Sequence, residues 1–446
     1  MIVDNLDDFN IFLDDASDKN IFLIPIYSDI NKHSVNNRIS LIYVHVIGGN
    51  TYAIPSNHSE SLIDRDLINK ISLNGLVFVL NKKRFMHHMN FESMFDYNTL
   101  NYFYTNTPIN LESYENNCIT HYIRRYGNIE NIIDIVPIVK LIEMCNLIRD
   151  DFIEFYENTK IDEKFAYYDL AFNDTLFNIE KNGLRVTEDF YHLFNYNQPV
   201  SDRVYSEYNI FTRTGRVSNA FGGVNFSAIN NNKDRECFIS RFGDSGMMVQ
   251  FDYSSYHLYL VSTLVGYTFP KDVSAHEYLG RYYYNKETLT EDEYIESKKI
   301  NFNILYGGID KDFLIIPFFK ITDNYIKEQW KSFVDDTYIY SPIFKRKINK
   351  SFFDDMNPSK LFNYLIQSME SETSIVNINK VVNLLESFKS KIILYTYDSI
   401  LVDFNKLDGG ELITNIKNIL ECEGKYPISV KVGYDFYNLI NIEKLK

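Results

Sequence analysis

The chain has 446 residues, of which 45% are apolar and 16% aromatic, a composition that supports more than one packed domain. Its net charge of −15 argues weakly against a nucleic-acid partner, yet it leaves room for a local basic channel and for metal-binding carboxylates. The four cysteines have no CxxC spacing, so neither a zinc site nor a disulfide framework is indicated. Without a long apolar run or a secretory signal, we expect a cytoplasmic protein with no membrane partner.

The first 150 or so residues are expected to form an α/β domain. Runs rich in β-branched and aromatic residues predict strands at 21–27, 39–46, 51–54 and 76–80. The turn signal Gly48-Gly49-Asn50 precedes the third strand, and residues 130–157 have the pattern of a helix.

The rest of the chain is expected to place strands and helices around two acids. A helix over 164–181 ends at the stop signal Asn182-Gly183. Further patterns predict helices at 256–265 and 291–306, and strands at 247–251, 392–397, 400–404 and 428–432. Asp252 directly follows the first of these strands, and Asp398 follows the second.

Asp252 and Asp398 would bring their carboxylates together if their strands were neighbours. Such a pair suits Mg²⁺, a hard cation that prefers oxygen ligands and substrate phosphates. Two ions roughly 3.5–4 Å apart stabilise the attacking and leaving oxygens of a phosphoryl transfer. The spacing alone leaves open that each aspartate only caps a strand or the helix that follows.

The predicted helix over 291–306 carries a third feature. Lys298, Phe302 and Tyr306 recur at i, i+4 and i+8, so they share one face. A cation followed by two rings suits a nucleoside triphosphate, with the lysine at the phosphates and a ring under the sugar and base. The same pattern alone also describes a buried aromatic stripe with a snorkelling lysine.

Eight segments between residues 164 and 446, taken in order, resemble family A DNA polymerases, the DNA polymerase I type. They are Glu180–Val186 (like MExxGIxV), Thr214–Ser218 (TGRLS), Asn225–Ile229 (PNLQNI), Phe251–Leu258 (motif A, DYSQIEL), Lys298–Gly307 (motif B, KxxNFxxxYG), Asn363–Gln367 (NxxxQ), Tyr397–Ser399 (motif C, HDE) and Val432–Phe436 (the closing strand). Each match is weak by itself, and their common order is what identifies the resemblance.

The resemblance implies an α/β and α+β multidomain fold, with an RNase H-like N-terminal domain and a right-hand polymerase palm and fingers. The expected parts are a 3′–5′ exonuclease-like domain at 1–155, a polymerase domain at 156–446, a reduced thumb at 187–213, a palm at 214–270 and 350–446, and fingers at 271–349. The first strand lacks the DxE of an exonuclease, and Asp29 comes late without its glutamate. We therefore expect a degenerate domain without proofreading activity.

The same resemblance implies a template-directed DNA polymerase that adds dNTPs to a primer 3′ end with two Mg²⁺ ions. The metals would be held by Asp252, Asp398 and the backbone carbonyl of Tyr253. The nucleotide would be bound by His276, Lys298, Phe302 and, at the sugar, His257. Contacts with primer-template DNA would come from Arg216, Asn225, Tyr306, Gly307, Asn363, Gln367 and Tyr397.

Several positions depart from the family pattern. His257 replaces the motif A glutamate that packs under the sugar and excludes a 2′-OH, and Tyr294 stands where a phosphate-binding arginine is expected. Asn303 replaces a glycine, and Ser399 replaces the second acid of motif C. The segment 187–213 is too short for a full thumb, so a processivity factor or a helicase is a candidate for a further partner. Both metal-binding aspartates remain, and catalysis is still expected.

Two alternatives stay open. A single-subunit RNA polymerase shares this palm and the Asp-Ser of motif C, and His257 leaves the choice of sugar undecided. A non-catalytic replication scaffold derived from a polymerase would explain the missing thumb and exonuclease acids. Such a scaffold has no physical need for two converging carboxylates, which repel each other unless a cation lies between them. The abundance of Asn, Ile, Lys, Tyr and Phe fits an A/T-rich genome and, with the compact length, a phage replicative polymerase.

Overall fold

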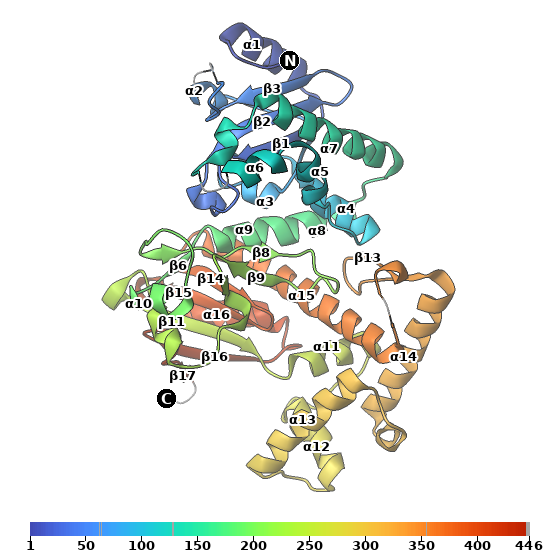
Figure 1. The fold of residues 1–446 in the computed structure, drawn as a ribbon. Coiled ribbons are helices and arrows are strands. Elements are labelled where there is room, and N and C mark those ends of the chain that lie inside the picture. The colour runs from blue at the N-terminus through green and yellow to red at the C-terminus, as the bar shows by residue number, and fades with distance from the viewer. Residues whose placement is uncertain (62, 64, 127–128, 354, 443–446) are drawn as a thin grey trace. The chain divides into compact units, whose positions relative to one another are not determined.

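The computed structural model describes residues 1–61, 63, 65–126, 129–353 and 355–442. The chain divides into two compact units, Met1–Lys181 and Asn182–Lys446, whose elements are shown in Figure 1. This division falls later than the expected boundary at 155/156. Helices α8 (Glu163–Asp169) and α9 (Thr175–Glu180) therefore belong to the N-terminal unit.

The N-terminal unit is built on a mixed five-stranded sheet in the order β3-β2-β1-β4-β5. Its strands are β1 (Ile21–Tyr27), β2 (Ile39–Val46), β3 (Thr51–Pro55), β4 (Val77–Val79) and β5 (Met94–Asp96). The central strand β1 pairs antiparallel with β2 and parallel with β4. The four strands predicted in this part of the chain are confirmed.

The helices of this unit are α1 (Leu6–Ala16), α2 (Arg65–Ile68), α3 (Lys82–Phe85), α4 (Tyr97–Thr105), α5 (Leu111–Cys118), α6 (Thr120–Tyr126) and α7 (Ile138–Asn158), followed by α8 and α9. The helix predicted from residue 130 begins only at Ile138, because Pro137 occupies its N-cap. Phe152 of α7 stacks on Phe22 of β1, with ring centroids 4.0 Å apart, and so joins this helix to the sheet.

The helix predicted over 164–181 is present, but it contains a π-helical turn at Leu170–Asp174, between α8 and α9. Buried charges are paired around this turn. The ammonium of Lys82 lies 2.9 Å from the Asp169 carboxylate and 2.6 Å from that of Asp174. Because a buried charge is costly unless it is paired, these contacts fix α8 and α9 against α3.

The C-terminal unit is built on an antiparallel sheet in the order β14-β15-β11-β16-β17. Its strands are β11 (Gly246–Tyr253), β14 (Lys391–Thr396), β15 (Ser399–Asn405), β16 (Ile428–Gly433) and β17 (Ile440–Asn441). Strand β11 lies between β15 and β16, and β14 joins β15 through a tight turn at Tyr397-Asp398. The four strands predicted here are confirmed, with ends that move by a residue or so.

The helices of this unit are α10 (Asp189–Phe194), α11 (Tyr256–Val265), α12 (Ala275–Tyr284), α13 (Glu291–Gly307), α14 (Pro317–Asp336), α15 (Pro358–Leu385) and α16 (Glu411–Glu421). Both helices predicted from periodicity are confirmed, and α13 begins with a capping box formed by Thr290 and Glu293. Helices α12 and α13 pack side by side (Figure 1), and α11, α13 and α14 all contact the long helix α15. In the described part of the chain, no helix is long and apolar enough to cross a membrane.

The segment expected to be a reduced thumb contains the six-residue helix α10 and two short strands, β7 (Arg203–Val204) and β8 (Tyr208–Asn209). The strand β7 pairs with β6 (Leu184–Arg185), while β8 pairs with β9 (Ser218–Phe221), which in turn pairs with β10 (Val224–Asn225). A further hairpin joins β12 (Tyr338–Tyr340) and β13 (Lys347–Asn349). Phe190 of α10 shares a hydrophobic core with Leu394 and Leu401 of the central sheet, so this segment packs onto the sheet.

Candidate functional site

The central strands bring the two predicted acids together. Asp252, near the end of β11, pairs in register with Ser399 of β15. Asp398 directly precedes Ser399, and its carbonyl accepts a 2.9 Å hydrogen bond from the backbone N–H of Tyr253. The two strands that end at the acids, β11 and β14, are not neighbours, because β15 lies between them. The acids still come together, because the turn from β14 into β15 places Asp398 next to the in-register partner of Asp252.

The environment of both carboxylates disfavours their negative charge. Burial raises the pKa of Asp252, and the charge of Lys431 offsets only part of this shift. Although the Asp398 side chain reaches solvent, the surrounding protein raises its pKa to about 6 by desolvation, and repulsion from Asp252 and Glu370 adds to this effect. Two carboxylates that repel each other are each favoured in the charged form only if an opposite charge lies close by.

The backbone on both sides of the site is held in an uncommon conformation. Tyr397, which precedes Asp398, has a φ of 53°, and Ser255, the N-cap of α11, has a φ of 56°. Non-glycine residues with positive φ are uncommon, cost about 1–3 kcal/mol, and cluster at functional sites. Here they allow tight reversals of the chain directly after β14 and after β11.

Two cavities share Asp252 and Asp398 in their walls. We call the first the helix-side cavity. It has a volume of about 380 Å³, and α11, α12 and α13 line it with His257, His276, Tyr294, Lys298, Phe302 and Tyr306. We call the second the strand-side cavity. It has a volume of about 330 Å³ and is lined by Asn231, Arg235, Gln250, Thr396, Tyr397 and Lys431, among others.

The predicted face of α13 opens into the helix-side cavity. The rings of Phe302 and Tyr306 are nearly parallel, at 8°, with centroids 5.9 Å apart. Phe302 remains 43% exposed, which is unusual for a large apolar side chain in a core. The ammonium of Lys298 lies 4.6 Å from the centroid of the Tyr294 ring, a cation–π contact. The alternative of a buried aromatic stripe therefore does not describe this face.

His276 also lines the helix-side cavity, but its chemistry differs from that of a phosphate-binding cation. It is 4% exposed, and its Nδ1 lies 3.0 Å from the Asn301 amide nitrogen. Burial lowers the pKa of His276 to about 4, and the charge of Lys298 adds to the shift. The imidazole is therefore neutral near pH 7, and any phosphate contact would be a hydrogen bond without charge.

The remaining predicted DNA contacts lie outside these two cavities, within the described chain. Asn363 and Gln367 follow one another on α15 and share a 3.0 Å hydrogen bond. Asn225 is exposed at the end of β10, beside Phe226 of the strand-side cavity. Gly307 is exposed with open space around it, so its lack of a side chain is not explained by a close neighbour.

The sequence motifs missed Glu370, which lies three residues after Gln367 on α15. It is 1% exposed, and it binds both Arg216 and His257 at the wall of the helix-side cavity. One signal was available, because residues 363, 367 and 370 have the i, i+4, i+7 spacing of a single helix face.

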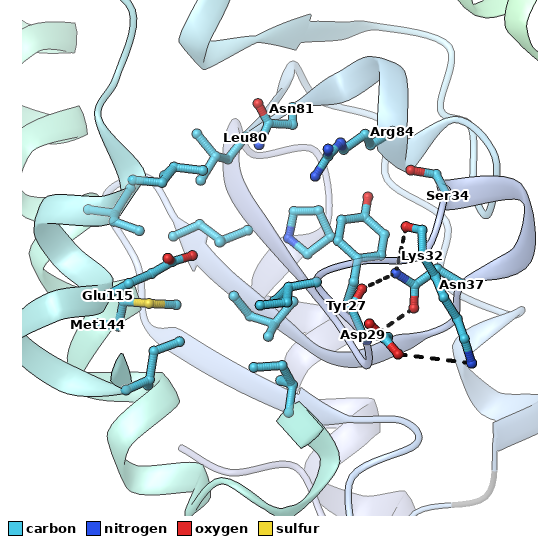
Figure 2. A pocket seen from close by; sticks show the side chains of 18 residues that line it. Tyr27, Asp29, Lys32, Ser34, Asn37, Leu80, Asn81, Arg84, Glu115 and Met144 are labelled. Atoms are coloured by element: carbon cyan, nitrogen blue, oxygen red, sulfur yellow. Dashed lines mark hydrogen bonds and ion pairs between the residues drawn. The ribbon is translucent and has the colours of Figure 1, made fainter. Parts of the chain in front are cut away.

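The N-terminal unit has its own cavity, of about 210 Å³, beside β1 (Figure 2). Figure 2 shows Asp29, Lys32 and Asn37 together on one side of it, and Glu115 and Met144 on the other. Half of the lining residues are aliphatic, including Ile24, Ile26, Ile119, Ile133 and Ile148. Across the described residues of the whole chain, no group of three or more His, Cys, Asp or Glu side chains is arranged to hold a metal ion.

Comparison with known proteins identifies the fold. No protein-family model matches the sequence, and no curated protein matches it. Among solved structures, the POL domain of Pol1 from M. smegmatis, in a complex with DNA primer-template and dNTP, aligns with a TM-score of 0.73. The alignment covers 98% of this chain and 100% of that one at 12% sequence identity. The expected mixed α/β multidomain fold is thus confirmed, and the chain has the fold of a polymerase domain.

Proposed function

We propose that this chain is a template-directed DNA polymerase that adds dNTPs to the 3′ end of a primer. The observation that carries this proposal is that the helix-side and strand-side cavities share Asp252 and Asp398. A nucleotide in the first cavity and a primer end in the second would meet at the two carboxylates. The bound primer-template and dNTP of the mycobacterial domain, which has the same fold, support this function.

The helix-side cavity suits a nucleoside triphosphate. The exposed ring of Phe302, stacked on Tyr306, offers a flat apolar surface for a base and sugar. The ammonium of Lys298 offers a cation for the phosphates, and its contact with Tyr294 orients it within the cavity. Tyr294 therefore does not replace the charge of the arginine expected at its position, but it supports the neighbouring lysine.

The strand-side cavity suits the end of a nucleic-acid strand. Its cations are Lys431 of β16 and Arg235, whose guanidinium is held by the carbonyl of Ile229 at 2.6 Å and lies 4.3 Å from the Phe436 ring centroid. Phosphate contacts of this kind position a strand without reading its sequence. Tyr397 contributes a ring beside Asp398, where a primer terminus would lie.

The carboxylates fit Mg²⁺ as the cofactor. Asp252 and Asp398 supply hard oxygen ligands. Burial raises the pKa of both, and repulsion from Asp252 and Glu370 adds to the shift of Asp398, so the charge of the pair is poorly compensated. Asp252 and Asp398, with the backbone carbonyl of Tyr253, would hold two ions. When bound, the ions supply positive charge that stabilises the oxygens that attack and leave.

The reaction joins the primer 3′ oxygen to the α-phosphorus of the dNTP and breaks the bond from that phosphorus to the bridging oxygen. Pyrophosphate leaves, and the hydroxyl proton passes to water. The chain's own side chains contribute by binding and orientation: Lys298 holds the leaving phosphates, Phe302 holds the nucleoside, and Arg235 and Lys431 hold the primer. Such positioning supplies much of the catalysis in phosphoryl transfer.

Primer extension by the full chain tests this function. We expect extension of a labelled primer with dNTPs and Mg²⁺ by the wild type, and loss of extension in Asp252→Asn and Asp398→Asn while primer-template binding persists. Asp244→Asn is a matched control, since Asp244 is an exposed acid just before the opposite end of β11. Near-normal extension by either site variant at saturating Mg²⁺ would refute the assignment.

The same assay separates the two alternatives. Extension with NTPs but not with dNTPs would favour a single-subunit RNA polymerase. No extension with either, despite primer-template binding, would favour a non-catalytic scaffold. Phage origin and a host-cytoplasm location remain predictions from composition and length.

A further inference from the structure

Glu370 is a buried carboxylate at the centre of a cluster with Arg216 and His257, and it belongs to none of the eight sequence segments. It lies on α15, 1% exposed, at the wall of the helix-side cavity. The Arg216 Nε lies 2.6 Å from its Oε2, and the Arg216 Nη2 donates a 3.2 Å hydrogen bond to its Oε1. The His257 Nε2 lies 3.1 Å from the same Oε1. One carboxylate therefore holds two side chains of the cavity.

The imidazole of His257 is held at both of its nitrogens. Opposite Glu370, its Nδ1 is hydrogen-bonded to the hydroxyl of Tyr306, whose ring meets the imidazole edge-on at 82°. Because each ring nitrogen has a partner on a different helix, the ring cannot turn without breaking a bond. Glu370 on α15 and Tyr306 on α13 thus fix the orientation of a residue on α11.

The charge of Glu370 is compensated, unlike that of the two proposed metal ligands. Burial alone would raise the pKa of Glu370, but hydrogen bonding and the charges of His257 and Arg216 outweigh it, so the pKa lies below its usual value. Arg216 is itself fixed, since its guanidinium lies 3.7 Å from the centroid of the Tyr397 ring. A buried carboxylate with this many partners is an anchor for them and has little capacity left for a metal ion.

The residues that line the helix-side cavity indicate which part of a nucleotide His257 would face. The rings of Phe302 and Tyr306 line one part of the wall, and Asp252 and Asp398 line another. A nucleotide that places its base on the rings and its phosphates at the carboxylates has its sugar between them. His257, the second residue of α11, lines the same cavity and lies against Tyr306, so it faces that sugar.

We propose that Glu370 is a positioning residue that sets the sugar selectivity of this enzyme by holding His257 rigid against the nucleotide. This inference rests on the proposed polymerase function. A fixed imidazole leaves no space into which an added 2′-hydroxyl can push, whereas an imidazole released from Glu370 can turn aside. Glu370 acts on the nucleotide through His257, which it holds by the contact between its Oε1 and the His257 Nε2.

Single-nucleotide incorporation by the full chain tests the role, with the ratio of kcat/KM for a dNTP over the matching NTP as readout. Glu370→Gln keeps the size but removes the charge, and His257→Ala removes the wall. We expect each to lower the ratio by about tenfold or more, a usual scale for hydroxyl discrimination in a pocket. The double variant should discriminate no worse than His257→Ala, because Glu370 acts through that residue.

Glu372→Gln is the matched control. Glu372 is also buried on α15, but it accepts hydrogen bonds from the backbone N–H groups of Ile343 and Phe344. We expect this variant to lose thermal stability while its dNTP-over-NTP ratio stays that of the wild type. Equal losses of selectivity in both variants would mean that Glu370 only stabilises the fold.

Glu370→Asp keeps the test decisive if Glu370→Gln does not fold, because it retains the charge and withdraws the carboxylate from His257. It should also lower the ratio. An unchanged ratio in a folded, active Glu370 variant would overturn the role, as would a multiplicative loss in the double variant. A wild type that extends no primer would instead refute the polymerase function, which is a separate outcome.

Discussion

The environment of Asp398 disfavours its ionisation. In the metal-free protein its pKa lies at about 6, above the ordinary value of 3.8, because of desolvation and of repulsion from Asp252 and Glu370. Between pH 4 and pH 6 the folded state then binds more protons than the unfolded state, so stability falls as pH rises through this window. Above pH 6 the full loss of folding stability is present. The cation that the proposed reaction needs would offset this loss.

The first prediction follows from the folding stability that is lost when Asp398 ionises. Asp398→Asn should raise the midpoint of thermal unfolding of the metal-free protein at pH 7.5 and leave it nearly unchanged at pH 4. The gain should be about 1 kcal/mol, because Asp398 reaches solvent and screening reduces the full effect of the shift. Thermal unfolding with a chelator at both pH values measures it. A variant that is less stable than the wild type at pH 7.5 would contradict the prediction.

Thermal unfolding with added Mg²⁺ separates the effect of the Asp398 charge from an effect of the substitution on packing. Added Mg²⁺ should stabilise the wild type at pH 7.5 and stabilise Asp398→Asn less, since ligands that bind the folded state raise its stability. Below pH 6, where Asp398 takes up a proton, the Mg²⁺ effect on the wild type should weaken. Equal stabilisation of both proteins by Mg²⁺ would place the metal elsewhere.

The second prediction concerns Phe302. Its exposed ring has no hydroxyl, and in the family that the sequence resembles, phenylalanine here accompanies poor use of dideoxynucleotides. We expect the wild type to prefer dNTPs strongly over ddNTPs, and Phe302→Tyr to relax this preference. Competition between the two nucleotides on a primer-template measures it. Phe313→Tyr, which adds a hydroxyl to a half-buried ring in the core of the same helical region, should leave the preference intact.

Single residues were predictable from sequence where a strand or a periodic face marked them. Asp252 and Asp398 each follow an apolar run, and Lys298, Phe302 and Tyr306 share a helix face. All five line the helix-side cavity, although the local patterns alone left their roles open. Glu370 was not found, because its partner Arg216 lies 154 positions away in the chain. A glutamate inside a helix usually indicates a solvated face, and only the tertiary contacts identify it as buried.

Among the elements, the strands of both sheets were the most predictable, because continuous apolar runs bounded by turns have few other interpretations. The long helix α15 was recognised only at residues 363–367, although it runs from Pro358 to Leu385. Its buried residues lie on nearly every side, so it lacks the one-sided apolar stripe that marks a helix in sequence. The start of α7 was missed although Pro137 is visible in the sequence, whereas the π-helical turn before α9 lies among buried ion pairs that the sequence pattern does not contain.

The third prediction belongs to the N-terminal unit. Asp29 lies at the rim of the cavity in Figure 2, where it meets Lys32 and Asn37. Asp96 is fully buried and caps α4 by accepting a 2.6 Å hydrogen bond from the backbone N–H of Thr99. These two acids have separate structural partners, and only Asp29 of the two lines the cavity. We expect no 3′→5′ degradation of single-stranded DNA with Mg²⁺ or Mn²⁺.

The measurement is the length of end-labelled single-stranded DNA after incubation with the full chain and no dNTPs. Any degradation should persist in Asp29→Asn and Asp96→Asn and so be traced to a contaminant. Degradation that disappears in either variant would show that the unit retains a catalytic centre.

At the scale of the whole molecule, the order of eight weak motifs predicted a fold that 12% identity alone could not establish. Order along the chain is informative because the motifs occupy successive elements, β11, α13, α15 and the β14–β15 turn, of one sheet-and-helix unit. The division after Lys181 was not predicted, because α8 and α9 are joined to the N-terminal unit by ion pairs such as Lys82–Asp169. Such contacts between distant residues leave no local signal in the sequence.

The last prediction concerns the grip of the whole chain on DNA. Residues 187–213 contain two arginines, Arg203 and Arg213, against four acids, and the helix α10 packs into the core beneath. With a net charge of −15, few cations remain to hold a duplex through its phosphates, which dominate non-specific affinity. We expect the wild type to add few nucleotides per binding event, and fewer still as salt rises, measured as product length under single-hit conditions with a trap.

Asp202→Lys, at an exposed position beside Arg203, should lengthen the products at low salt and lose this gain at moderate salt. If the unaided wild type instead adds hundreds of nucleotides per binding event, the chain must grip the duplex through a surface other than this segment.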